Sequence, residues 1–302
     1  MTEEEFDELR PSVFAIAYRR LGSVSEAEDV VQEGFLRLHR TREGGERIES
    51  PRAYLSTVVS RLSLDHLRSA RVRRETYVGE WLPEPLVASV DDDPARKAEM
   101  ADSLSLAFLV LLESLSPEQR AAYLLHDVFD EPYDRIAEIV GTSEQNARQL
   151  ATRARRNVEE RRPRFETSRE QREELATRFF AAAEEGDLRG LEELLAHDVV
   201  LRGDGGGKAP ALARAVYGSG RAARTLINSL RARARFGITW RRAEVNGQPG
   251  ALFFDREGRL ISVMSLDVAE GQIQGVSSIV NPDKLRHLGP LADVGALLRE
   301  RS

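Results

Sequence analysis

The sequence contains no cysteine, which excludes a disulfide scaffold, thiol catalysis and thiolate zinc sites. Its lysines are few (Lys97, Lys208 and Lys284), so arginine carries nearly all of the positive charge. The most apolar segment, residues 104–112, is far shorter than the roughly 20 residues of a membrane-spanning helix. The first residues are acidic, whereas a signal peptide begins with positive charge. These absences predict a cytoplasmic protein that does not contact a membrane.

The chain has 302 residues, enough for about two domains and a sizeable core. Lys and Arg number 44 against 50 Asp and Glu, which gives a net charge of -6. This balance excludes a uniformly basic nucleic-acid-binding protein but leaves room for local basic patches.

The first half of the chain has the apolar spacing of helices. The pattern predicts three helices in residues 1–76, the first ending at Gly22, the second starting at the capping box of Ser25 and Glu28, and the third starting at Ser50 and Pro51. Residues 77–103 are acidic and broken by proline, which is typical of a linker. A second helical unit follows in residues 104–165, with a capping box that begins at Ser116.

Two helices concentrate arginine. The positive residues of the first are Arg52, Arg61, Arg68, Arg71, Arg73 and Arg74, and those of the second include Arg148, Arg153, Arg155 and Arg156. In an acidic protein such patches indicate contact with a phosphate backbone. A solvated helix face is the alternative explanation for either patch taken alone.

The second patch lies in a more specific pattern. A short helix over residues 132–140, a turn at Gly141 and a helix capped by Ser143 form a predicted helix-turn-helix. The second helix of this motif enters the major groove with its N-terminus first, where Asn and Gln can read adenine and Arg can read guanine. The predicted DNA-binding residues are Gln145, Asn146, Arg148, Gln149, Arg153 and Arg156. An ordinary helical hairpin stays open as the alternative.

After Pro163 the pattern changes to amphipathic helices and then, from Gly237 onward, to strands separated by turns. Helices followed by strands predict an α+β domain in residues 166–302. Its possible pocket-lining residues are His197, Asp198, Asp204, Trp240 and Asp267, of which His197 and Asp198 are expected to end a helix and Trp240 to pack in the core with Phe253. No catalytic dyad is evident. The run from Asp204 to Lys208 is not a nucleotide-binding loop, because Arg202 and Ala209 stand where that motif needs Gly and Ser or Thr.

Several segments resemble a known bacterial family. Residues 27–36, AEDVVQEGFL, are similar to region 2.2 of a sigma factor, and residues 64–71, LDHLRSAR, to its region 2.3–2.4 helix. Residues 115–120, LSPEQR, and the helix around Arg148 resemble region 4. Two such regions joined by a short linker are the layout of extracytoplasmic-function (ECF) sigma factors. The motifs WLPEP at 81–85, DGGGK at 204–208 and NPDKL at 281–285 resemble the SigJ-like ECF group with a SnoaL-like C-terminal extension.

The resemblance implies a role for each part. Two all-α sigma domains, region 2 and region 4, would precede a cone-shaped SnoaL-like α+β domain. Asp29, Gln32 and Glu33 match the surface that binds the β′ clamp helices of RNA polymerase core, while region 4 would meet the β flap. The residues that match the helix and loop for the -10 promoter element are Arg61, Asp65, Arg68, Arg71, Arg73 and Arg74. Region 4 would read the -35 element. The family uses no catalytic residue, cofactor or metal.

The extension is expected to regulate the sigma domains by an intramolecular contact. The residues that would make it are Trp81, Leu82, Pro83, Asp204, Lys208, Asn281, Asp283 and Lys284, with both lysines meeting the acidic linker. Asn281 and Asp283 also suit a simple turn before a helix. Two rival functions stay open: a one-component helix-turn-helix regulator with a ligand pocket, and a pocket enzyme with an inert helical extension. The sequence names no ligand for the pocket.

Overall fold

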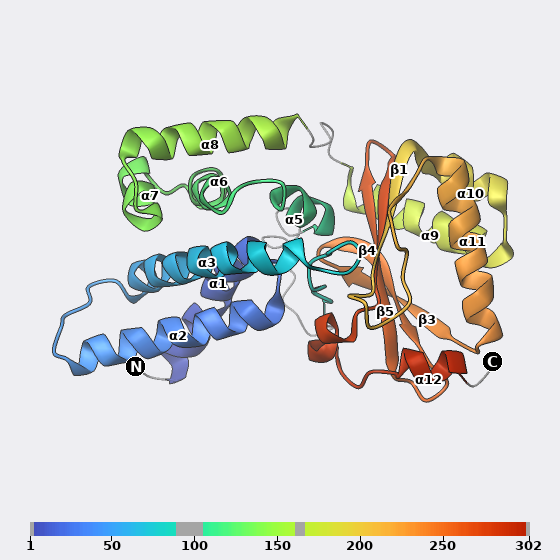
Figure 1. Cartoon of the computed structure of the whole chain (residues 1–302), viewed down its shortest axis with the longest axis horizontal. Coiled ribbons are helices and arrows are strands. Elements are labelled where there is room, and N and C mark those ends of the chain that lie inside the picture. Colours follow the sequence, from blue (N-terminus) through green and yellow to red (C-terminus); the bar gives the residue numbers. More distant parts are fainter. Residues whose placement is uncertain (1–2, 89–104, 161–166, 300–302) are drawn as a thin grey trace. The chain divides into compact units, whose positions relative to one another are not determined.

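The computed structural model describes residues 3–88, 105–160 and 167–299, and only the backbone of residues 3–4, 70–75 and 297–299. The chain divides into two compact units (Figure 1). The first combines Met1–Thr76 with Leu109–Arg162, and the second combines Tyr77–Phe108 with Pro163–Ser302. The described linker residues therefore cluster with the C-terminal domain. No described helix is both long and apolar enough to cross a membrane.

The first unit begins with a bundle of α1 (Glu3–Leu21), α2 (Val24–Glu43) and α3 (Pro51–Glu75). The α2 and α3 backbones approach closely at Gly34, where a Cβ atom would meet Val59 at 2.9 Å. The predicted Ser25 and Glu28 capping box is wrong, because the side chain of Ser23 accepts from the backbone N–H of Glu26 and caps α2 instead. Because Gly22 follows the last residue of α1, Ser23 is the first residue that can cap α2.

Five further helical elements follow along the chain: α5 (Leu106–Leu112), α6 (Pro117–Tyr123), η1 (Leu124–Val128), α7 (Tyr133–Val140) and α8 (Glu144–Glu159). The predicted capping box at Ser116 is confirmed, with Gln119 bonding back to the Ser116 N–H. Gly141 adopts the left-handed conformation between α7 and α8, with φ of 75°. Ser143 caps α8 by accepting from the N–H of Asn146. The helix, turn and helix predicted over residues 132–158 are thus present.

The second unit is an α+β domain, as predicted. Its helices are α9 (Arg169–Glu185), α10 (Leu188–Leu194), α11 (Ser219–Arg235) and α12 (Val294–Arg299), with short turns η2 (Pro282–Lys284) and η3 (Arg286–Leu288). The strands are β1 (Leu195–Asp204), β2 (Val216–Tyr217), β3 (Thr239–Val245), β4 (Gln248–Phe254), β5 (Leu260–Ala269) and β6 (Gln272–Ile279). They form one sheet in the order β2-β1-β6-β5-β4-β3, in which β1 and β6 are parallel and the other pairs antiparallel.

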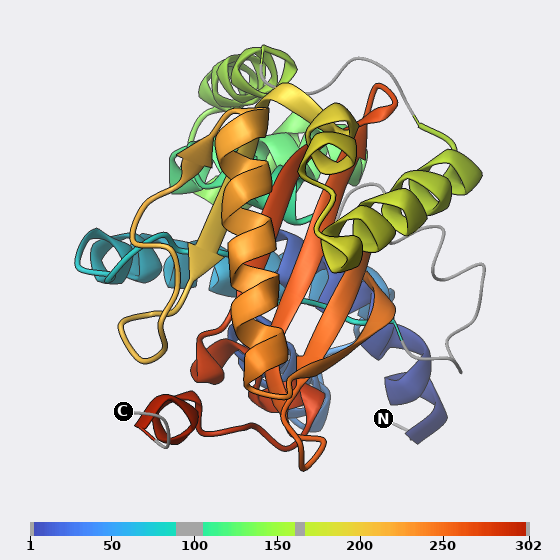
Figure 2. The ribbon, with the colours of Figure 1, turned by 90° about the vertical axis from the view of Figure 1, so that its right-hand side faces the viewer.

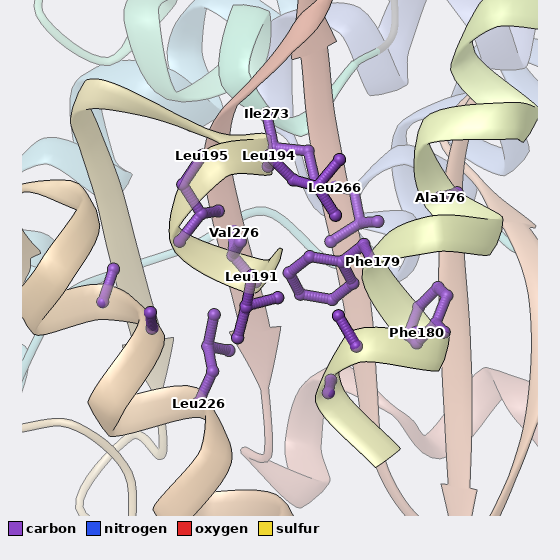
Figure 3. Packing of buried hydrophobic residues seen from close by; sticks show 14 of the residues in the cluster. Ala176, Phe179, Phe180, Leu191, Leu194, Leu195, Leu226, Leu266, Ile273 and Val276 are labelled. Atoms are coloured by element: carbon purple, nitrogen blue, oxygen red, sulfur yellow. The ribbon is translucent and has the colours of Figure 1, made fainter. Parts of the chain in front are cut away.

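Helices α9, α10 and α11 cover one face of this sheet (Figure 2), and the main core lies between them. Figure 3 shows Phe179 of α9 directed toward Leu191, whereas Phe180 lies on the other side of the helix, where it stacks on Trp240 of β3. Trp240 and Phe253 pack in this cluster, which confirms their predicted core position. Because side chains alternate along a strand, Val199 and Leu201 of β1 face the helices, while the even-numbered residues, including Asp204, face the other way.

The strand pattern from Gly237 onward is confirmed, but one local prediction is wrong. His197 and Asp198 do not end a helix, because they lie exposed within β1. Strand β1 pairs with the two-residue strand β2 and, over most of its length, with β6, whose paired residues lie more than seventy positions further along the chain, so no local pattern predicts this strand.

Candidate functional site

One face of α2 carries the residues predicted to bind polymerase. Asp29 and Gln32 are exposed, and Glu33 is partly exposed and pairs with Arg37 at 2.8 Å. Leu36, which is not among the predicted residues, is 42% exposed and lies one helical turn after Gln32 and Glu33. These four residues, which we call the polymerase face, therefore combine acidic and amide groups with an exposed apolar side chain. The helical spacing of Leu36 from Gln32 and Glu33 is the sequence signal that could have identified Leu36.

The residues predicted for the -10 element lie on α3. Arg61, Asp65 and Arg68 are exposed, while the side chains of Arg71, Arg73 and Arg74 lie outside the described residues. Arg68 donates to Glu118 of α6 at 3.0 Å, and Arg61 donates to Glu138 of α7 at 2.8 Å. Within this predicted set, the two arginines whose side chains the structure describes are thus paired with carboxylates of the predicted region 4.

The predicted -35 residues occupy the first turns and the exposed side of α8. Gln145, Asn146, Arg148, Gln149, Arg153 and Arg156 are all exposed, whereas the alanines of the inner face are buried. Arg148 pairs with Glu144 at 2.5 Å and lies over the ring of Tyr133. This arrangement presents amide and guanidinium groups from the capped end of a helix, which suits hydrogen bonding to base edges in a major groove.

Regions 2 and 4 also share a buried surface. Leu64 of α3 belongs to the same apolar cluster as Ala121 of α6 and Ile136 of α7. Arg135 of α7 donates to the hydroxyl of Thr57 on α3. Together with the two ion pairs, these contacts hold the predicted -10 helix against the predicted -35 domain.

Two arginines are buried where α1 meets α6. Arg120 of α6 is paired with Glu113 and donates to the Arg19 carbonyl at 3.2 Å. Arg20 of α1 is 0% exposed, and its guanidinium nitrogens have no hydrogen-bond partner among the described residues. Burial lowers the pKa of Arg20 to about 9; the charge of Glu131 partly offsets this shift, and the charge of Arg120 adds to it. A buried cation without a bonded partner destabilises the packing that covers it.

The described part of the linker is anchored on Asp204 at the end of β1. The Asp204 carboxylate accepts from the Tyr77 hydroxyl at 2.6 Å, from the Leu82 N–H at 2.8 Å and from the Lys284 ammonium at 2.6 Å. Asp204 is 0% exposed and the Lys284 side chain 7%, so this is a buried ion pair with additional hydrogen bonds. The three motifs WLPEP, DGGGK and NPDKL therefore meet at one carboxylate, and we call these contacts the linker latch.

Lys284 and Tyr77 extend the latch. The Lys284 ammonium also donates to the Leu82 carbonyl and lies over the Trp81 ring at 4.2 Å. Asn281 donates to the Tyr77 hydroxyl at 2.8 Å. Burial, followed by the hydrogen bond to Asp204, raises the pKa of the Tyr77 hydroxyl, so Tyr77 stays a neutral donor. Tyr77 was missed in the sequence because it precedes the motif.

The DGGGK loop fits closely against the linker. Gly206 and Gly207 have φ of 58° and 70°, a conformation that favours glycine. A Cβ atom on Gly206 would meet the Asn281 amide at 2.2 Å, and one on Gly207 would meet Val78 at 3.2 Å. Lys208 pairs with Asp283 of the NPDKL motif. Lys208 is expected to meet acidic residues of the linker. Those residues lie outside the described ones: Asp91, Asp92, Asp93, Glu99 and Asp102.

The linker continues to the opposite edge of the sheet. Leu86 and Asn246 exchange hydrogen bonds at 2.9 and 2.7 Å, Ala88 donates to the Glu244 carbonyl at 3.1 Å, and Val87 bridges Val245 of β3. His287 contacts the Pro85 carbonyl at 2.8 Å. Leu82, Pro83, Glu84 and Pro85 are all buried. Residues 77–88 therefore cross the sheet from β1 to β3 on the face that the helices leave uncovered.

Among the residues predicted to line a pocket, Asp267 has a shifted pKa. It lies on β5, on the same face as the linker, and burial raises its pKa to about 6, which the charge of Arg202 partly offsets. Arg202 also lies 3.7 Å from Glu80 of the linker. The other candidates are separate from it: His197 and Asp198 are exposed, Trp240 is in the core and Asp204 is in the latch.

Comparisons with known proteins agree with this geometry. Residues 6–73 match the family Sigma-70 region 2, and residues 105–158 match the family Sigma-70, region 4. The chain is 40% identical to the ECF RNA polymerase sigma factor SigJ of Mycobacterium tuberculosis, over 100% of this chain and 96% of that protein. It is 34% identical to the probable ECF RNA polymerase sigma factor SigI of that organism, over 89% and 90% of the two chains. The crystal structure of M. tuberculosis SigJ has a TM-score of 0.77 at 39% identity and covers 94% of this chain and 98% of that one.

Proposed function

The chain belongs to the ECF RNA polymerase sigma factors, and from this premise we propose that it directs core polymerase to promoters through two readers. Sigma factors bind RNA polymerase core and promoter DNA, and they initiate transcription without catalysing a reaction themselves. In this proposal α3 contacts the -10 element and α8 the -35 element. The observation that carries it is the exposed, capped start of α8, where Gln145, Asn146 and Arg148 face outward together.

Polymerase binding is assigned to the polymerase face of α2, with region 4 meeting the β flap. Asp29, Gln32 and Glu33 offer acceptors to a basic coiled coil such as the β′ clamp helices. Leu36 adds an exposed apolar side chain at the C-terminal end of that face, which can be buried on binding. The i, i+3, i+4, i+7 spacing aligns these four side chains along one side of the helix.

Regulation is assigned to the linker latch. The C-terminal domain holds residues 77–88 through a buried ion pair, several backbone hydrogen bonds and a short β-bridge. Because the linker connects regions 2 and 4, fixing it limits how far the two promoter readers can separate. Covalent attachment supplies a high effective concentration, so a modest interface is enough to favour the latched state.

The test is in vitro transcription with core polymerase and the full chain on candidate promoters. We expect initiation that requires the chain and is lost in R148A/Q149A, with retained binding to core. A matched control is R178A in α9, which removes an exposed arginine outside both readers. If no promoter is used while the chain alone binds a specific duplex, the one-component regulator is the better assignment.

A further inference from the structure

Helix α11 of the C-terminal domain carries a stripe of arginines that the proposed function does not use. Arg221, Arg224, Arg231 and Arg235 are all exposed, and Asn228 lies between them in the same spacing. At 3.6 residues per turn these five positions fall within one narrow arc. They lie opposite the buried face formed by Ala222, Ala223, Leu226 and Ile227. We call these five residues the α11 stripe; Figure 2 shows the helix lying along the sheet.

The charge of the α11 stripe is not neutralised locally. Residues 219–235 contain no Asp or Glu. None of the four arginines forms an ion pair or a side-chain hydrogen bond with another described residue. Some exposed arginines elsewhere in the same domain are paired, as Arg169 is with Glu244 and Arg242 with Glu173. The stripe is therefore an exposed cationic surface on a chain whose net charge is -6.

Helix stability does not explain this arrangement. The N-cap is Gly218, without a side-chain hydrogen bond, and the first turn contains no acidic residue. Arg221 stands near that N-terminus, where a positive charge opposes the helix dipole. Arg221 and Arg224, like Arg231 and Arg235, are also like-charge pairs at helical spacing, which weaken a helix. Arg235 lies in the last turn, where the dipole favours a positive charge, but Arg221 and the like-charge pairs disfavour the helix, which points to an external anion.

The shape and chemistry of the stripe fit a polyphosphate chain. Arg221 and Arg235 are separated by about 21 Å along the helix at 1.5 Å per residue. The neighbouring residues Thr225, Ser229 and Ala232 are small, so a phosphate backbone can approach the helix. Arginine, amide and hydroxyl side chains are the groups that contact phosphates in DNA complexes. The stripe contains no exposed apolar side chain of the kind that a membrane-binding helix inserts.

We propose that the α11 stripe binds the sugar-phosphate backbone of duplex DNA that flanks the two promoter elements, adding a sequence-independent contact from the C-terminal domain. The proposal rests on the proposed sigma function, because that function brings the chain to duplex DNA. The domain thereby contributes to promoter affinity in addition to holding the linker. Its contribution depends on salt, because each phosphate contact releases condensed counterions.

The experiment measures binding of holoenzyme to a promoter fragment with flanking duplex on both sides and to the same fragment with one or both flanks removed. Two full-chain variants, R221Q/R224Q and R231Q/R235Q, are compared with R178Q/R189Q, which removes the same charge from exposed positions of α9 and α10. Because Arg231 also lies against Gly186 at the end of α9, thermal unfolding of the second variant is measured as well.

We expect each stripe variant to lose about tenfold in affinity for the flanked fragment and to lower the salt slope by about two. Neither variant should differ from wild type on DNA without flanks. Equal losses on both fragments, no loss, an equal loss in the control, or a stripe that binds anionic vesicles and not DNA would each overturn the proposal. If the wild-type holoenzyme forms no promoter complex on any fragment, the sigma function itself has failed.

Discussion

Arg68 on α3 donates its Nε proton to Glu118 on α6 at 3.0 Å, so a residue predicted to contact the -10 element is paired with a carboxylate of the -35 domain. Arg61 and Glu138 repeat this relationship one helix further on. The carboxylates accept from guanidinium groups that are predicted to contact promoter DNA. In this packing both arginines are therefore engaged within the helical unit.

Releasing these arginines should strengthen binding to the -10 strand. In E118Q/E138Q both ion pairs are lost, and each exposed pair contributes about 0.2–1 kcal/mol. We expect a gain of about two- to tenfold in affinity for a single-stranded -10 oligonucleotide, measured by fluorescence anisotropy. E173Q/E193Q, which removes two paired carboxylates from the C-terminal domain, is the matched control. Unchanged affinity would show that the pairs do not limit access to α3.

The pairing of Arg68 with Glu118 should not change with pH near neutrality. Burial raises the pKa of Glu118, but its backbone hydrogen bond and the Arg68 guanidinium outweigh that and hold the pKa below the usual value. A carboxylate with a depressed pKa stabilises the pairing at every pH above its unfolded pKa, and this contribution is lost only as the pH falls through the folded value. Protonation of Glu118 near neutral pH therefore does not release Arg68.

Arg20 makes the packing of regions 2 and 4 less stable than it could be. Its charge is fully buried without a hydrogen-bond partner among the described residues, so R20M should raise the free energy of unfolding by about 1–3 kcal/mol in urea at pH 7. Burial has lowered the pKa of Arg20 to about 9, so the wild-type deficit should stay constant below that pH and shrink only as the pH rises above it. R37M, on the surface of α2, is the control. A less stable R20M would show that Arg20 has a compensating partner.

The linker latch can be tested with two buried carboxylates of the same domain. D204N should release residues 77–88, because Asp204 accepts the Leu82 N–H and pairs with Lys284, and breaking a buried pair costs about 3–5 kcal/mol. D255N is the control, since Asp255 is also buried but bonds only the turn before β5. We expect faster amide exchange at Leu82, Leu86 and Ala88 in D204N alone, together with altered transcription. Equal exchange in both variants would remove Asp204 from the latch.

The sequence predicts this fold best where a local signal marks an element. Serine caps, first-position proline and Gly141 place the ends of the region 4 helices correctly because each acts within one turn. At the start of α2 two overlapping Ser-x-x-Glu patterns compete, and the choice of Ser23 depends on where α1 stops. Strand β1 is missed because its pairing with β6 is non-local and parallel.

Local sequence signals also do not predict the contacts of the candidate site. The resemblance gathers the three motifs, but the contacts that join them span long stretches of chain, such as Tyr77 with Asp204. Tyr77, Asn246 and His287 carry no motif that sets them apart from ordinary surface residues, and only the folded sheet edge gives them partners. The pairing of Arg61 and Arg68 with carboxylates of another region is likewise invisible in the sequence.

Leu36 tests the polymerase face. Its side chain is 42% exposed beside Gln32 and Glu33, and L36S should weaken binding to core polymerase by about tenfold because it loses apolar burial at the interface. Stability should change little, since Leu36 is not in the helical core. L188S, at another exposed leucine of similar exposure, should bind core normally. Equal binding by wild type and L36S would place the polymerase contact elsewhere on α2.

Asp267 gives the clearest pH prediction in the C-terminal domain. Its folded pKa of about 6 lies above the unfolded value, so the folded state holds its proton more tightly. The protonated Asp267 carboxyl group stabilises the folded state fully below pH 4, and this stabilisation is lost as the pH rises through 6. D267N, which stays neutral, should therefore unfold at a higher temperature than wild type at pH 7.5, with a gain of at most about 3 kcal/mol, and match it near pH 4. A D267N variant that is less stable than wild type at pH 7.5 would mean that Asp267 is ionised and paired in the folded protein, for example with Arg202.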